Sequence, residues 1–171
     1  MKKRITLAIT GHRDMIERDE LKQELNDYLD EIITHNSKSK IVLLSPLAEG
    51  ADRFVAKLFL EKKEKHKNLQ LIVPMPYERE RYLKDFDQAS TLEFLAMVKQ
   101  AGRSFAVPHL SQSAYLDVGR YVVDNADILL ALWDGTFNGK VGGTGDIVNY
   151  ARTQNREVLH FLCERDAISL P

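Results

Sequence analysis

The sequence has little of several features that would narrow its function at once. It holds a single cysteine, Cys163, which excludes an internal disulfide framework and a metal site built from several cysteines. No apolar run approaches the roughly 20 residues that cross a bilayer. The apolar run behind the basic start ends at Gly11, too early for a signal peptide. We therefore expect a cytoplasmic protein with no membrane partner.

An excess of charge of one sign is also missing. Lys and Arg number 24 against 25 Asp and Glu, in a chain of 171 residues. This balance argues against nucleic acid or an anionic membrane as the main partner. The length suits a single domain over residues 1–171 with one substantial core. The lysine-rich stretch 62–67 is interpreted as a solvated helix end, with a partner-binding patch as the alternative.

Short apolar runs alternate with longer amphipathic ones along the chain. Strands are predicted at 5–9, 41–44, 69–73 (stopped by Pro74), 104–107, 127–133 and 158–162. Helices are predicted between them, including a capping-box start at Ser90, one from Ser113 to about Asn125 and one from about Asp146. Apolar strands that alternate with helices indicate an α/β fold. We expect a Rossmann-like, doubly wound, mainly parallel sheet with helices on both faces.

Ligands of such sheets bind outside the carboxyl ends of the strands, near the point where the strand order reverses. This rule selects the strand-end residues as candidates for ligand contact. They are Gly11, His12 and Arg13; Glu49, Gly50, Ala51 and Asp52; Asp134; and Gly142, Gly143, Thr144, Gly145 and Asp146.

The segment Gly11-His12-Arg13 follows the first predicted strand. Gly11 lets backbone amides approach a ligand closely, and Arg13 offers a forked pair of donors to phosphate or carboxylate. His12 titrates near neutrality and can donate or accept a proton. The alternative is a turn with two exposed polar side chains.

The segment Glu49-Gly50-Ala51-Asp52 begins a predicted helix. One interpretation sets the amides of Gly50 and Ala51 near a phosphate, with Glu49 or Asp52 on a ribose hydroxyl. The other is structural, because a helix dipole favours a carboxylate such as Asp52 in the first turn.

The stretch from Gly142 to Asp146 has three glycines in four residues between a strand and a helix. Amides at a helix N-terminus, with no side chains in the way, form an anion site. The alternative is a purely structural turn. Asp146 has three candidate roles: contact with ribose, acid or base, or helix cap. The stretch is not a P-loop, because no Gly-Lys-Ser/Thr follows at the required spacing.

Five segments together resemble the SLOG superfamily of Rossmann-like nucleotide-binding domains, which includes DNA-processing protein A and the Lonely guy phosphoribohydrolases. The segments are 9–13, 44–54, 73–76, 121–135 and 142–151. The resemblance implies a pocket for a nucleotide or nucleotide-sugar derivative of the AMP or ADP-ribose kind. It also implies a homodimer and a role in nucleotide signalling or phage defence, with an effector partner that the sequence does not identify.

One position departs from the hydrolytic relatives. Their motif is Pro-Gly-Gly-x-Gly-Thr-x-x-Glu, and Asn149 stands where the glutamate belongs, with Asp146 in place of the threonine. Asparagine cannot exchange a proton as a carboxylate does. The leading hypothesis is therefore a nucleotide sensor or binding module without metal or cofactor. The alternative is a nucleotide N-glycosidase with Asp146 or Glu49 as the catalytic acid.

Overall fold

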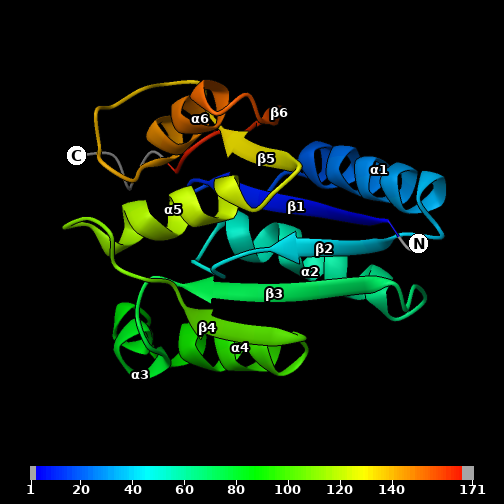
Figure 1. Cartoon of the computed structure of the whole chain (residues 1–171), viewed down its shortest axis with the longest axis horizontal. Helices are drawn as coiled ribbons and strands as arrows, with labels where there is room; N and C mark the ends of the chain where they lie inside the picture. The colour runs from blue at the N-terminus through cyan, green and yellow to red at the C-terminus, as the bar shows by residue number, and fades with distance from the viewer. Residues whose placement is uncertain (1–2, 167–171) are drawn as a thin grey trace.

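The structure is a computed structural model that describes residues 3–166. In these residues six strands form one sheet in the order β4-β3-β2-β1-β5-β6 (Figure 1). The strands are β1 (Arg4–Gly11), β2 (Lys40–Leu44), β3 (Leu69–Met75), β4 (Arg103–Ala106), β5 (Ile128–Trp133) and β6 (Glu157–Leu162). All strand pairings in the sheet are parallel, which confirms the predicted Rossmann-like α/β fold.

Helices cover both faces of this sheet. They are α1 (Asp19–His35), α2 (Ala51–Lys63), α3 (Arg79–Tyr82), α4 (Gln88–Lys99), α5 (Ala114–Asp124) and α6 (Thr144–Thr153), with a 3₁₀ turn η1 (Leu83–Asp85) after α3. The core of one face holds side chains from α1, α2 and α4. α5 and α6 cover the opposite face and lie in front of the sheet in Figure 1. No helix within residues 3–166 is both long and apolar enough to cross a membrane.

Side chains of the central strands alternate between the two cores. In β1, Leu7 and Ile9 pack under α1 and α2, whereas Ala8 packs under α5 and α6. In β5, Leu130 belongs to the core under α1 and α2, and Leu129 belongs to the core under α5 and α6. Because both faces are buried, successive positions must all be apolar, and this explains the near-continuous apolar runs in the sequence.

Two local predictions are wrong. The capping box at Ser90 does not start a helix, because α4 begins at Gln88 and its N-cap is Asp87, whose carboxylate accepts from the Ser90 N–H at 2.8 Å. The strand predicted at 69–73 is two residues longer, since β3 continues through Pro74 and ends at Met75, just before Pro76. β2 pairs with β3 only as far as Ile72, so no ladder hydrogen bond to β2 is lost at the proline.

The order of the strands reverses between β1 and β5. From β1 the chain adds β2, β3 and β4 outward on one side, then returns to place β5 and β6 on the other. The carboxyl ends of β1 and β5 therefore diverge into separate loops and leave space between them. This is the point at which ligands bind in sheets of this class.

Candidate functional site

A cavity of about 600 Å³ lies at the carboxyl ends of β1 and β5. Eight of the predicted site residues line it: Gly11, His12, Arg13, Asp52, Gly142, Gly143, Thr144 and Gly145. The other five, Glu49, Gly50, Ala51, Asp134 and Asp146, are outside its lining. The structure thus brings the end of β1, one acid of α2 and the glycine stretch before α6 around a single space.

Gly11 is required by close packing at the centre of this wall. A Cβ atom added to it would lie 2.3 Å from the Ala51 Cβ and 2.8 Å from the Leu132 carbonyl oxygen. The start of α2 and the end of β5 therefore meet directly over Gly11. The glycine permits the approach of protein backbone and side chain, in addition to forming part of the cavity wall.

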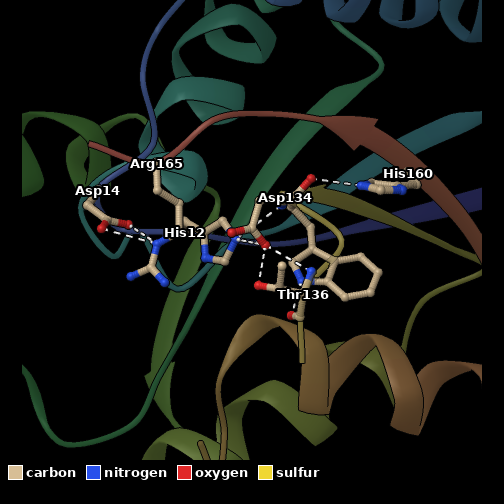
Figure 2. A network of polar contacts seen from close by, with 7 residues as sticks. His12, Asp14, Asp134, Thr136, His160 and Arg165 are labelled. Carbon is tan, nitrogen blue, oxygen red and sulfur yellow. Dashed lines mark hydrogen bonds and ion pairs between the residues drawn. The ribbon is translucent and has the colours of Figure 1, made fainter. Parts of the chain in front are cut away.

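His12 joins the ends of β1 and β5. Its side chain is 9% exposed, and its Nε2 lies 3.2 Å from both the backbone nitrogen and the Oδ1 of Asp134. Burial lowers the pKa of His12 below its ordinary value, although Asp134 acts in the opposite direction. The ring is therefore neutral at pH 7, and its hydrogen bonding to Asp134 fixes the two strand ends relative to each other (Figure 2).

Asp134 is held in turn by Thr136. The Thr136 N–H and hydroxyl donate to Asp134 Oδ1 at 3.0 and 2.8 Å. Burial raises the pKa of Asp134, but the hydrogen bonds from Thr136 and the contact with His12 outweigh it and lower the pKa overall. Asp134 thus organises the loop after β5, and Thr136, which the sequence analysis did not select, reaches the cavity in its place.

Arg13 is exposed at the cavity. Its guanidinium carbon lies 5.5 Å from the centre of the Tyr115 ring. No carboxylate among residues 3–166 forms an ion pair with it, whereas Tyr115 donates its hydroxyl to Asp85. Burial and Asp85 raise the pKa of Tyr115 to about 12, so its hydroxyl stays neutral. The cation of Arg13 is therefore available to an anionic ligand.

The turn before α2 is occupied by contacts inside the protein. Gly50 has φ 82°, and an added Cβ would lie 2.4 Å from the Arg13 carbonyl oxygen. The Ala51 N–H donates to the His12 carbonyl at 3.1 Å and is not available to a phosphate. Glu49 is half-buried outside the cavity lining. This turn supports the end of β1.

Asp52 is the one predicted residue of this turn that reaches the cavity. It is 7% exposed, and its Oδ2 accepts from the Ala48 N–H at 3.1 Å. Burial raises the pKa of Asp52 to about 7, against the effects of that hydrogen bond and of Arg13 and Arg53. A cavity carboxyl that exchanges its proton near neutral pH can either donate or accept a hydrogen bond.

The neighbouring Arg53 belongs to the scaffold, and the sequence analysis did not distinguish it. It is 3% exposed, and its Nε donates to the Leu47 carbonyl at 2.9 Å. Its Nη1 donates to the Ser90 hydroxyl at 2.8 Å and lies 3.2 Å from Glu93 Oε1. Arg53 therefore ties the turn after β2 to α4.

The glycine stretch presents three free amides at the start of α6. Gly142, with φ 75°, donates its N–H to Asp146 Oδ2 at 2.8 Å, and Gly143 donates to the Lys140 carbonyl at 3.0 Å. α6 has no side-chain cap, and within residues 3–166 the N–H groups of Thr144, Gly145 and Asp146 have no hydrogen-bond partner. The amides open to an anion are thus those of residues 144–146, and the Asp146 side chain holds the loop that precedes them.

Arg165 lines the cavity from a part of the chain that sequence reasoning missed. Met15 and Arg165 form an antiparallel bridge, and the Arg165 Nε lies 2.9 and 3.2 Å from the two carboxylate oxygens of Asp14 (Figure 2). The segment after β6 is in this way fastened to the segment after β1. No motif in the sequence signals this contact, because it joins residues 151 positions apart.

Metal ligands are not gathered at this site. Among residues 3–166 no three His, Cys, Asp or Glu side chains are placed to hold a metal ion. The available chemistry is that of free amides and guanidinium groups for an anion, together with the Asp52 carboxyl.

Comparison with known proteins identifies the fold. No protein-family model and no curated protein sequence matches the chain. DNA processing protein A (DprA) from Streptococcus pneumoniae is similar in structure, with a TM-score of 0.58 and 11% sequence identity over 91% of this chain. The chain spans about half of that protein, 50% of its length. The structural-genomics target TM1055 gives a TM-score of 0.49 at 12% identity, over 90% of this chain and 72% of that one. The similarity to DNA processing protein A concerns the fold, which is the Rossmann-like α/β fold that the sequence predicted.

Proposed function

We propose that the cavity binds a nucleotide or nucleotide-sugar derivative of the AMP or ADP-ribose kind, and that the protein acts as a sensor or binding module. The observation that carries this proposal is the row of free amides at Thr144, Gly145 and Asp146. They begin a helix beside a cavity at the switch point between β1 and β5, where the unpaired Arg13 also lies.

A phosphate suits this arrangement on three counts. The positive end of the α6 dipole and the free N–H groups both favour an anion. Arg13 supplies a full positive charge that no carboxylate neutralises within residues 3–166. The volume of about 600 Å³ falls within the range of small-molecule sites. Apolar and aromatic wall residues, among them Ile9, Val118 and Tyr82, are suited to a base.

The hydrolase alternative receives no support from the same geometry. Asp146 accepts the Gly142 N–H, and Glu49 does not line the cavity, so neither proposed acid faces the ligand space. Asn149 stands at the position of the glutamate in the hydrolytic relatives. We therefore favour binding without cleavage, and no free base should appear when the protein is incubated with nucleoside monophosphates or NAD.

Replacement of Thr144 by proline tests the phosphate cradle. Thr144 is the first residue of α6, where proline fits the helix, and Gly143 has φ −72° and ψ 170°, which suits the residue before a proline. T144P thus deletes one free amide and leaves the helix intact, whereas the control T144A keeps the amide and loses only the side-chain hydroxyl and methyl group.

The readout is thermal shift and calorimetry with AMP, ADP, NAD, ADP-ribose and cyclic nucleotides. A ligand present at 100 times its Kd stabilises the wild type by about 2.7 kcal/mol. T144P should bind about tenfold or more weakly, since a hydrogen bond to a charged group contributes about 1.5–3 kcal/mol, and T144A should bind like the wild type. No shift with any phosphate-bearing ligand would refute the proposal. Equal affinity in T144P would exclude the α6 amides as the phosphate site.

The resemblance also leads us to propose a homodimer, which light scattering on the purified chain would detect. Nucleic acid is not the expected partner, given the balanced charge. A salt-dependent complex with a single-stranded oligonucleotide would reverse that expectation.

A further inference from the structure

We propose that Asp52, as a neutral carboxylic acid, donates a hydrogen bond to an acceptor atom of the bound nucleotide. The cavity would then select ligands whose base presents a ring nitrogen or carbonyl oxygen at this point. The inference rests on the proposed function of the same cavity and names the feature of the ligand that it recognises.

The position of Asp52 suits this role. It lies in the first turn of α2 and in the cavity wall, with 7% of its surface exposed. Its Oδ2 accepts the Ala48 N–H. Its Oδ1 has no hydrogen-bond partner within residues 3–166. This oxygen is also not among the fully buried side-chain atoms that lack a partner, so it keeps some access to solvent. One oxygen of the carboxyl group is therefore anchored to the turn, and the other faces the cavity.

Within residues 3–166 no group forms an ion pair with Asp52, although the charges of Arg13 and Arg53 partly oppose the effect of its burial. Arg53, next to it on α2, donates its Nε and Nη1 to other partners. Tyr82 of α3 donates its hydroxyl to the Pro46 carbonyl at 3.1 Å. Arg13, after β1, is exposed, and Asp85 of η1 is engaged by Tyr115. Because no ion pair offsets burial, the pKa of Asp52 rises to about 7 and the neutral acid is available at physiological pH.

The two protonation states make opposite demands on a ligand. A neutral carboxyl can donate to an acceptor, whereas an ionised carboxylate can only accept, for example from a ribose hydroxyl. If the ligand presents an acceptor, complex formation retains the proton on Asp52, and affinity falls as the pH rises above about 7. If the ligand presents a hydroxyl, the affinity rises over the same range. The direction of the pH dependence therefore identifies the atom that Asp52 contacts.

Calorimetry with ADP-ribose, NAD and cyclic AMP from pH 6.5 to 8.5 provides the test. The phosphates of these three probes are diesters with no ionisation in this range, unlike a monoester, whose second pKa is about 6. The other titratable groups of the wall are displaced away from this range: burial lowers the pKa of His12 below its ordinary value, and the pKa of Tyr115 is about 12.

Asp52→Asn is the decisive variant, because its amide donates a hydrogen bond at every pH. The matched control is Asp27→Asn on α1, an exposed residue that accepts a hydrogen bond from Gln23, and it changes the net charge equally. We expect the affinity of the wild type and of D27N to fall by up to tenfold per pH unit above about pH 7. D52N should bind with a Kd that does not change over this range and should exceed the wild-type affinity at pH 8.5.

Three results would overturn the inference. They are a wild-type affinity that does not change with pH, an affinity that rises with pH, and a D52N profile that falls like the wild type. Each of these three results can be obtained only if the ligand binds, so none of them contradicts the proposed function. Absence of binding by all three probes and AMP at every pH would overturn the proposed function and the inference together. The wild-type profile is decisive by itself if D52N does not fold.

Discussion

The turn before α2 and the loop before α6 occupy equivalent places in the fold and use their backbone in opposite ways. Both follow a central strand, contain glycine at positive φ, and lead into a helix with an acid in its first turn. In the first, the Ala51 amide and the Leu47 carbonyl are bonded inside the protein. In the second, the amides of residues 144–146 are free beside the cavity. A turn that contains glycine can therefore offer an anion site only when its amides are left without protein partners.

The two regions also differ in solvent exposure: the turn before α2 is covered, and the loop before α6 is exposed. The first turn is covered by α3 and α4, where Tyr82 bonds Pro46 and Arg53 reaches Ser90. The second carries Phe137 and Val141 on its surface, 59% and 62% exposed. The first region therefore determines stability, and the second can change its contacts when a ligand binds. Four predictions test this division, from the largest expected effect to the smallest.

Alanine in place of Gly50 should be the most damaging change. The added methyl group would lie 2.4–2.6 Å from the backbone of His12 and Arg13, at φ 82°. We expect a loss of about 3 kcal/mol or more in the free energy of unfolding, measured in urea. The control is Gly139→Ala in the second loop, at φ 73° with nothing within 4 Å. It should cost about 1 kcal/mol, and equal losses would contradict the division.

Methionine in place of Arg53 should cost about 2–4 kcal/mol of stability, because it leaves the Leu47 carbonyl without its donor and removes one of the two cations bonded to Glu93. The same substitution at Arg13 should change stability by less than about 0.5 kcal/mol and weaken phosphate-ligand binding about tenfold. Urea unfolding and calorimetry on both variants measure the two effects. A large loss of stability in R13M would show that Arg13 belongs to the scaffold.

Asn in place of Asp52 should stabilise the protein, and its advantage over the wild type should grow by roughly 2–3 kcal/mol from pH 5 to pH 8, since each pH unit between about 5 and 7 costs the ionisable wild type about 1.4 kcal/mol. The folded pKa of about 7 lies above the ordinary value of 3.8. The wild-type protein, whose Asp52 can ionise, therefore loses stability as the pH rises from about 4 to 7. Its stability does not fall further above pH 7 for this reason. Unfolding of both proteins at pH 5 and pH 8 checks the sign. A constant difference between the two pH values would show that Asp52 is not protonated in the fold.

Serine in place of Phe137 should have the smallest effect on stability, below about 1 kcal/mol. The ring packs edge-on against Trp133 with centroids 4.8 Å apart, yet it is largely exposed. Trp133 is the sole tryptophan, so its fluorescence reports on the loop directly. We expect a changed emission spectrum with an almost unchanged urea midpoint. A cost comparable to that of R53M would place this loop in the scaffold.

Most of the fold could be predicted from the sequence because its signals are local. Runs such as 128–133 are apolar at every position, as expected of a strand that is buried on both faces. The helix start after Ser113 was predicted correctly, and the Ser113 hydroxyl accepts the Leu116 N–H there. The predicted start of α4 was wrong, because Asp87 and Ser90 are both favourable N-cap residues. In the structure Asp87 is the cap, and the Ser90 hydroxyl accepts a hydrogen bond from Arg53.

The site was predictable only in part. The rule that ligands bind at the carboxyl ends of parallel strands correctly selected Gly11, Arg13 and the glycine stretch as neighbours of one cavity. It could not show that Ala51 donates to His12 or that Asp146 holds Gly142. The rule did not select Arg165, because the position of Arg165 depends on its backbone pairing with Met15.

The sequence by itself determined the strands, the parallel sheet and the edge of the sheet at which the cavity lies. Apolar periodicity and the handedness of βαβ units leave few other arrangements. Tertiary structure decided which backbone amides remain free, which acid faces the cavity and which arginine is buried. These outcomes depend on hydrogen bonds between residues far apart in the chain. No local pattern records whether Asp52 or Glu49 turns inward, although the environment of that side chain sets its proton affinity.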